Sequence, residues 1–254
     1  MLQVEKVSKS YRSTSVLTEV TFQMEQGESL GLIGESGSGK STMAKLIVGL
    51  EHLDGGQITL NGLDFQQLRG AELRKARRHV QVVFQDPWAS LNPKLPVWKS
   101  IIEPLENYPD VVPSFLKGVR NDKRKMAEIL LEKVGLDRDF LERYPHQLSG
   151  GQRQRVGIAR GIGLQPNLLI CDEPTSSLDV SIQAQILNLL KELKKEFNMS
   201  YLFISHDMAS VQYMCDRIAV FKQGVLVDLF LSKDLFSDTR HPYTKMLVQA
   251  TVER

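Results

Sequence analysis

The chain has 254 residues, 42% of them hydrophobic, which suffices for one large α/β domain or for one domain with an insertion. Its 32 basic and 30 acidic residues leave a formal charge of +2, which favours neither nucleic-acid binding nor an acidic partner. No apolar run reaches the roughly 18 residues of a membrane-spanning helix, and no signal sequence precedes the first strand pattern, so we expect a cytoplasmic protein.

Short strands and turns are expected over most of the first 60 residues. Apolar residues alternate with polar ones in LQVEKV and QITL, and glycines separate these stretches. The segment SLGLI, residues 29–33, is typical of a short buried strand. Glycines follow at once, and residues 41–50 then place apolar side chains at helical spacing. This segment therefore predicts a strand, a glycine-rich loop and a helix in succession.

A change of composition follows the next predicted strand, residues 80–84. Prolines are expected to interrupt regular structure there, at Pro87, Pro93, Pro96, Pro104, Pro109 and Pro113. A helix is predicted from Asp122 to about residue 136, with Gly135 as its C-terminal stop. We interpret residues 86–160 as an inserted, mainly helical subdomain.

The remaining elements alternate between strand and helix, which predicts a parallel sheet and an α/β fold class. The apolar strand NLLICDE spans residues 167–173, an amphipathic helix spans 181–197, and strands follow at 201–205 and 217–221. The two cysteines, Cys171 and Cys215, have no paired ligand spacing, so we expect packed thiols rather than a disulfide or metal site.

The loop GESGSGKST has the spacing of a phosphate-binding loop between a strand and a helix. Its glycines allow backbone N–H groups to converge on phosphate oxygens, and the following helix adds a positive N-terminal dipole. Lys40 is predicted to bridge the β- and γ-phosphates of a nucleotide, and Ser41 to bind Mg²⁺. The predicted phosphate-binding residues are Gly34, Glu35, Ser36, Gly37, Ser38, Gly39, Lys40, Ser41 and Thr42.

Two carboxylates end the strand NLLICDE, at the sheet edge where the phosphate loop is also expected. Asp172 suits Mg²⁺, directly or through water, because a hard cation prefers carboxylate oxygen. Glu173, one residue further on, suits polarising the attacking water. The alternative, a strand that simply ends in charged residues before Pro174, would be favoured without the phosphate loop.

A second motif, LSGGQ at residues 148–152, is carried by few nucleotide hydrolases. With the phosphate loop it makes the chain resemble the ATPases of ATP-binding cassette (ABC) systems. The resemblance covers nearly the whole chain. It implies a P-loop NTPase core with an N-terminal antiparallel β-subdomain and an inserted α-helical subdomain. The single domain 1–254 would comprise a nucleotide-binding core, residues 1–85 and 161–254, and a helical and signature subdomain, residues 86–160.

The resemblance also implies roles for further residues. Gln85 would sense Mg²⁺ and the attacking water, and so count as both a catalytic and a metal-site residue. His206 would contact the γ-phosphate, and Tyr11 would stack on adenine. The segment SSLD, residues 176–179, resembles a loop that crosses a dimer interface. Four signature residues would bind the γ-phosphate of an ATP molecule held by the opposite subunit: Ser149, Gly150, Gly151 and Gln152.

This arrangement implies a head-to-tail dimer in which ATP joins two subunits and its hydrolysis weakens their interface. Charge-assisted contacts to phosphate contribute about 1.5–3 kcal/mol each, so losing several would reverse closure.

Two stretches resemble one branch, the ATPases of peptide and nickel importers. They are FQDPWASLNP, residues 84–93, followed by IIEPL, and a tail that contains HPYT, residues 241–244. The branch implies a second, non-identical ATPase, two permeases, an extracytoplasmic binding protein, and a peripheral position on the cytoplasmic face of the membrane. Trp88 would help to receive a permease helix. No nucleic-acid partner is expected.

The substrate prediction rests on less. Peptide-transporting members often continue past HPYT into a cysteine-containing tail, whereas this sequence stops at Arg254. This difference favours nickel, cobalt or a metal chelate as the substrate, with di- or oligopeptides as the alternative. ABC ATPases of DNA repair or translation form a further class. They usually carry two cassettes, coiled coils or zinc motifs, which this sequence lacks.

Overall fold

The computed structural model describes residues 1–86, 88 and 91–252, and its contacts divide them into two compact units. Unit 1 comprises residues 1–80 and 200–254, and unit 2 comprises residues 81–199. Three residues of the predicted branch segment FQDPWASLNP, Pro87, Ala89 and Ser90, lie outside the described part of the chain.

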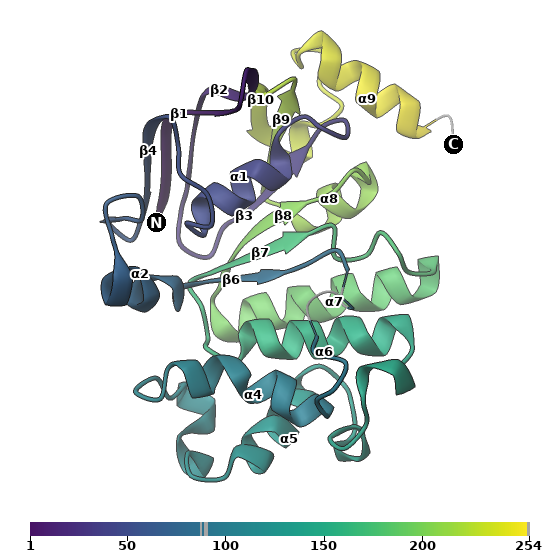
Figure 1. Ribbon diagram of the computed structural model, residues 1–254. Helices are drawn as coiled ribbons and strands as arrows, with labels where there is room; N and C mark the ends of the chain where they lie inside the picture. Colours follow the sequence, from purple (N-terminus) through teal and green to yellow (C-terminus); the bar gives the residue numbers. More distant parts are fainter. Residues whose placement is uncertain (87, 89–90, 253–254) are drawn as a thin grey trace. The chain divides into compact units, whose positions relative to one another are not determined.

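Unit 1 contains an antiparallel sheet of four strands in the order β2-β1-β4-β5. Figure 1 labels three of them, β1, β2 and β4. Its strands are β1 (Leu2–Tyr11), β2 (Thr14–Met24), β4 (Gly55–Leu60) and β5 (Leu63–Asp64). β1 pairs antiparallel with β2 on one side and with β4 on the other. The inward side chains of β1 alternate along the strand as the sequence pattern predicts: Leu2 and Val4 are fully buried. The expected N-terminal antiparallel β-subdomain is therefore present.

A second group of strands in unit 1 follows the order β10-β9-β3-β8. Its strands are β3 (Ser29–Ile33), β8 (Ser200–Ile204), β9 (Arg217–Lys222) and β10 (Val225–Leu231). β3 is parallel to both β8 and β9, and β10 returns antiparallel to β9. β3 and β8 are buried along their whole length, which explains their continuous apolar sequences. Unit 1 also contains the helices α1 (Lys40–Ile47), α2 (Gly70–Arg77), α8 (Met208–Met214) and α9 (Pro242–Val252), and the short η4 (Ser232–Asp234).

Unit 2 is mainly helical. It contains α4 (Val97–Asn107), α5 (Lys123–Lys133), α6 (Gly150–Ile162) and α7 (Val180–Phe197), with the short turns η1 (Ser114–Val119), η2 (Arg138–Phe140) and η3 (Pro145–Gln147). Its two strands, β6 (Val80–Val83), which starts on the last residue of unit 1, and β7 (Leu168–Asp172), are neighbours in the sheet order. Asp122 caps α5 by accepting from the backbone N–H of Lys125 at 2.9 Å, and Gly135 follows its end with φ +69°, as predicted.

The proline-rich stretch is more regular than the sequence predicts, because α4 forms within it. Pro96 stands directly before the first residue of α4, where a missing N–H costs nothing, whereas Pro104 lies inside the helix and removes one backbone hydrogen bond. The apolar face compensates: Ile101, Ile102 and Leu105 are buried, so tertiary packing overrides the local proline signal. The prediction of interrupted structure was wrong for residues 97–107.

Both cysteines are buried, as expected for packed thiols. Burial, with the nearby charge of Asp172 as a smaller cause, raises the pKa of Cys171 far above its usual range. Among the described residues, no helix combines the length and the apolar character that crossing a membrane requires.

Candidate nucleotide site

The predicted site residues divide between the two units. The phosphate loop, Tyr11 and His206 lie in unit 1, whereas Gln85, Asp172, Glu173 and the signature residues lie in unit 2.

The phosphate loop connects β3 to α1, as the sequence predicts. Lys40 is the first residue of α1 and is only 6% exposed. Its Nζ donates to the carbonyl oxygens of Gly34 and Glu35, both at 2.8 Å, and to Ser38 Oγ at 3.2 Å. A buried ammonium group requires such partners, and here they come from the loop itself. The loop thus folds around the amine that is predicted to contact phosphate.

Glycines are required at two points where the loop approaches other backbone. A Cβ on Gly34, whose φ is +151°, would lie 2.2 Å from the carbonyl oxygen of Phe221 on β9. A Cβ on Gly39, with φ +101°, would lie 2.6 Å from a methyl carbon of Leu17. Gly37 differs, because a Cβ there would meet nothing within 4 Å although φ is +79°. The loop is held tightly at its two ends and is open at its middle, which suits a phosphate group that enters there.

Tyr11 lies beside the last residue of the phosphate loop. Its hydroxyl forms hydrogen bonds with Thr42 and with Glu51, and the residue is 39% exposed. Partial burial, followed by the charge of Glu51 and the hydrogen bond to it, raises the pKa of Tyr11, so the phenol stays neutral. An exposed aromatic ring anchored next to the loop is the geometry that the predicted adenine contact needs.

His206 follows β8 at the same sheet edge from which the phosphate loop leaves β3. The two strands are parallel, with Leu32 paired to Ile204, so their carboxyl ends coincide. The side chain of His206 is exposed, and Asp207 starts α8 by capping it. The predicted contact of His206 with the γ-phosphate is compatible with this place and stays a prediction.

In unit 2, Glu173 directly follows β7 and has a left-handed backbone with φ +47°. This conformation is rare for a residue with a side chain and is retained where the surrounding structure enforces it. Here the backbone N–H and the hydroxyl of Ser176 both donate to the Glu173 carbonyl, at 3.3 and 3.2 Å. The turn therefore fixes the backbone of Glu173, from which the carboxylate side chain leaves.

Gln85 meets Glu173 although 88 positions separate them in the sequence. Its Nε2 donates to Glu173 Oε2 at 3.1 Å, which orients the carboxylate and leaves the amide oxygen of Gln85 as a possible metal ligand. Asp172, the last residue of β7, is half-buried beside Glu173. The structure thus brings together three residues that the sequence predicts for the metal and the water.

The signature LSGGQ forms the start of α6. Ser149 is the N-cap: its Oγ accepts from the backbone N–H of Gln152 at 3.3 Å, and its own N–H donates to Gln152 Oε1 at 2.9 Å. The side chain of Gln152 therefore organises the helix start. A Cβ on Gly150 would lie 3.3 Å from Leu178 Cδ2, in the turn before α7, and a Cβ on Gly151 would lie 2.7 Å from Ile182 Cγ2, on α7. Small residues let this helix end approach its neighbour closely.

One contact of the phosphate loop was missed by the sequence reasoning. The backbone N–H of Glu35 donates to the hydroxyl of Tyr243 on α9, at 3.4 Å, across 208 positions of sequence. The available signal was the HPYT motif, which we interpreted only as a mark of one branch.

Comparison with known proteins identifies the family of the chain. The ABC transporter family model matches residues 17–176. A peptide import ATP-binding protein of Brucella ovis is 41% identical over 98% of this chain and 78% of its own length. The oligopeptide transport ATP-binding protein OppF of Salmonella typhimurium is 45% identical over 91% of this chain and 67% of its own length.

A solved structure agrees as well. The ATP-binding cassette MJ0796, described as a dimeric post-hydrolysis state bound to ADP and Pi, has a TM-score of 0.80 and 30% identity over 91% of this chain and 99% of its own. The fold prediction is thereby confirmed. The chain belongs to the ABC transporter family and is an ATP-hydrolysing subunit of that family.

Proposed function

We propose that this chain energises the import of peptides by an ABC transporter. The observation that carries the proposal is the similarity of nearly the whole chain, 98% and 91% of it, to two proteins named for peptide import and oligopeptide transport. The sequence favoured nickel, cobalt or a metal chelate, with peptides as the alternative. That preference rested only on the expectation that peptide-transporting members continue past HPYT into a cysteine-containing tail, and the relatives support the alternative instead.

We propose the following division of labour at the site. The phosphate loop binds the phosphates of ATP through its backbone N–H groups and Lys40. Ser41, Asp172 and Gln85 supply the hydroxyl, carboxylate and amide oxygens that suit Mg²⁺, which would neutralise charge on the phosphates. Glu173, held by Gln85, accepts a proton from the attacking water, and His206 contacts the γ-phosphate. Tyr11 holds the adenine.

We further propose that two such subunits act as a head-to-tail dimer, in which Ser149, Gly150, Gly151 and Gln152 of one face the ATP of the other. The dimeric ADP- and Pi-bound state of the similar cassette supports this assembly. The partners would be a second, non-identical ATPase, two permeases and an extracytoplasmic binding protein. Their attachment would place the chain on the cytoplasmic face of the membrane. Residues 1–85 and 161–254 would be the nucleotide-binding core, and residues 86–160 the helical subdomain.

A contact within unit 2 supports coupling between permease and signature. Trp88 is 44% exposed, and the guanidinium of Arg153 lies 4.3 Å from its ring centroid. Arg153 also donates to the carbonyl oxygen of Leu148, the first residue of LSGGQ. A permease helix that moved Trp88 would therefore act on the signature through one intermediate side chain.

The substrate is tested by uptake in cells that lack the chromosomal copy of this chain. We expect the wild type to restore uptake of radiolabelled tri- and pentapeptides, and Glu173→Gln to restore none, because peptide import would depend on hydrolysis. Uptake of radioactive nickel should be the same in all strains. Nickel uptake that follows the complementing gene, with peptide uptake unchanged, would overturn the peptide proposal and return the metal alternative.

A further inference from the structure

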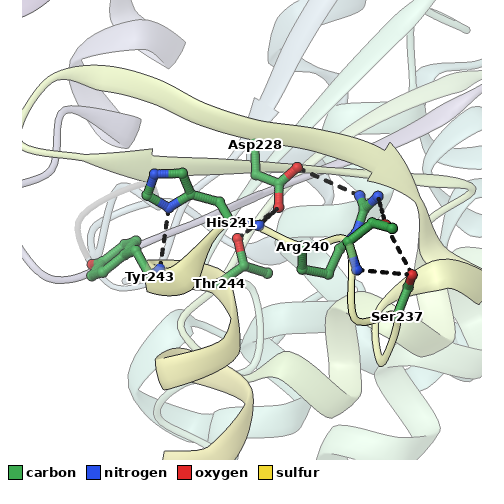
Figure 2. Close-up of polar contacts among 7 residues, drawn as sticks. Asp228, Ser237, Arg240, His241, Tyr243 and Thr244 are labelled. Atoms are coloured by element: carbon green, nitrogen blue, oxygen red, sulfur yellow. Dashed lines mark hydrogen bonds and ion pairs between the residues drawn. The ribbon is translucent and has the colours of Figure 1, made fainter.

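The HPYT segment, residues 241–244, lies at the start of α9 and is anchored by a single carboxylate on β10 (Figure 2). Asp228 Oδ2 accepts from the backbone N–H of His241 and from Thr244 Oγ1, both at 2.9 Å. Asp228 Oδ1 lies 3.4 Å from Arg240 Nη1. A negative charge at the start of a helix is favourable, and the side chain of Asp228 is only 13% exposed, which limits screening. The segment is therefore held firmly against the β9–β10 hairpin.

His241 completes this anchor by accepting, through Nδ1, a hydrogen bond from the backbone N–H of Tyr243 at 3.1 Å. Pro242, the first helical residue, has no N–H that would need a partner. Together these contacts fix the backbone from which the side chain of Tyr243 leaves.

Tyr243 connects the anchored HPYT segment to the phosphate loop. The residue is only 4% exposed, and Lys222 Nζ lies 4.8 Å from its ring centroid. The hydroxyl accepts from the backbone N–H of Glu35 at 3.4 Å and also hydrogen-bonds the Glu35 carboxylate. Burial is the main cause that raises the pKa of Tyr243, so the hydroxyl keeps its proton and can donate as well as accept.

Glu35 is also a partner of the loop lysine. Its carbonyl oxygen accepts from Lys40 Nζ at 2.8 Å and from the backbone N–H of Ser38 at 3.2 Å. One peptide segment therefore receives Tyr243 at its N–H side and Lys40 at its carbonyl side. The β9–β10 hairpin holds the loop at a second point, where the N–H of Gly224 donates to the carbonyl oxygen of Ser38 at 3.2 Å. The same hairpin carries Asp228.

We infer that Tyr243 is a positioning residue for nucleotide binding: its hydroxyl, set by the Asp228-anchored HPYT segment, fixes Glu35 and with it the conformation of the phosphate loop around Lys40. Tyr243 touches neither phosphate nor metal in this role. The inference rests on the proposed binding of ATP phosphates by this loop, and it gives the HPYT segment a function within this chain.

The test compares the purified full chain with Tyr243→Phe, which removes only the hydroxyl. Tyr213→Phe is the matched control, because it removes a hydroxyl from an exposed tyrosine on α8 of the same unit. Two measurements are made on each: the Kd for Mg·ADP by calorimetry, and amide hydrogen exchange of peptides that cover residues 34–42 and 242–252.

We expect Tyr243→Phe to raise the Kd about three- to tenfold, the effect of losing one hydrogen bond, and to speed exchange within residues 34–42. Tyr213→Phe should change neither quantity. Asp228→Asn, which weakens the anchor without touching the loop, should produce the same two effects in smaller measure.

An unchanged Kd and unchanged exchange within residues 34–42 would overturn the inference. So would faster exchange confined to residues 242–252, since that result would mean that the hydroxyl serves only to hold α9. Failure of the wild type itself to bind Mg·ADP would instead refute the proposed role of the loop, and this inference would fall with it.

Discussion

Glu173 combines a left-handed backbone, partial burial and a hydrogen bond from an amide, and together these restrict the orientation of its carboxylate. A side chain that is oriented before substrate arrives loses little freedom in the reaction, which is the usual advantage of preorganised catalytic groups. Its neighbour Asp172 still belongs to β7, so the two adjacent carboxylates leave the chain in different settings. This difference suits one for the metal and the other for water.

Replacing Glu173 by Gln should lower ATP hydrolysis by about 100-fold or more, because the amide cannot accept a proton from water. The Kd for ATP should stay within about twofold of the wild-type value, since the proposed role acts on the reaction and not on binding. Phosphate release and calorimetric binding measure the two quantities. Glu19→Gln is a matched control, because Glu19 is exposed and also has φ +47°. Hydrolysis by Glu173→Gln within tenfold of wild type would refute the assignment.

Tyr11 offers a second test at a single residue. Its ring, not its hydroxyl, should hold adenine, so Tyr11→Ala should weaken ATP binding about tenfold, in the range of aromatic–base stacking, while Tyr11→Phe stays near wild type. Binding of inorganic triphosphate, which has no base, should be unaffected by either change. Calorimetry with both ligands decides the matter. Equal losses in the two variants would show that the hydroxyl contacts with Thr42 and Glu51 matter instead.

The residues of the site differ in how far the sequence could predict them. The phosphate loop and the Asp172–Glu173 pair are local patterns, in which adjacent residue types and a preceding strand carry the information. Gln85 and Glu173 meet across 88 positions; the order of motifs in a known family suggested that both belong to one site, but not that they are in contact. Tyr243 and Glu35 are 208 positions apart and share no local pattern, so their contact depends on tertiary folding alone.

Strands and helices whose apolar residues recur at regular spacing were predicted well. Elements that are held mainly by tertiary contacts were not. α7 buries Ile186, Leu190 and Leu193, as expected for the amphipathic helix predicted over residues 181–197. By contrast, α2 is rich in charge and buries only Ala76, so its sequence gives almost no periodic signal. Arg77 from α2 donates to the carbonyl oxygens of Val48 and Gly49, contacts that no periodicity shows.

The start of α6 yields a prediction about packing. Gly151→Ala should lower the free energy of unfolding by about 1–3 kcal/mol, because its Cβ would lie 2.7 Å from Ile182 on α7. Gly157→Ala on the same helix is the control. Nothing lies within 4 Å of a Cβ there, so the better helix former should raise stability by up to about 1 kcal/mol. Urea unfolding of both variants measures the difference. Equal effects would mean that helix propensity, and not contact with α7, governs both sites.

For the whole molecule, the division of the site residues matters most. The phosphate loop belongs to unit 1, while Glu173, the carboxylate proposed to be catalytic, and the signature belong to unit 2. A single chain carries one copy of each motif. Suppose that Lys40 and Glu173 of one chain act on the same ATP, and that Ser149 of that chain acts on the ATP of the partner. A defect in Lys40 and a defect in Ser149, on different chains, then complement one another, whereas defects in Lys40 and Glu173 do not.

Mixing tests this dependence directly in ATP hydrolysis by the purified chain, where a second copy of this chain would take the place of the non-identical ATPase. Lys40→Ala and Ser149→Arg should each be inactive alone, but an equal mixture should recover about a quarter of wild-type activity: half of the dimers are mixed, and each mixed dimer has one intact site of two. A mixture of Lys40→Ala with Glu173→Gln should recover no activity. Both residues act on the ATP bound by their own chain, so each of the two sites in a mixed dimer still has one defective residue. Recovery in both mixtures, or in neither, would contradict the head-to-tail arrangement. The contrast between the two mixtures thus separates a shared site from a site that each chain completes by itself.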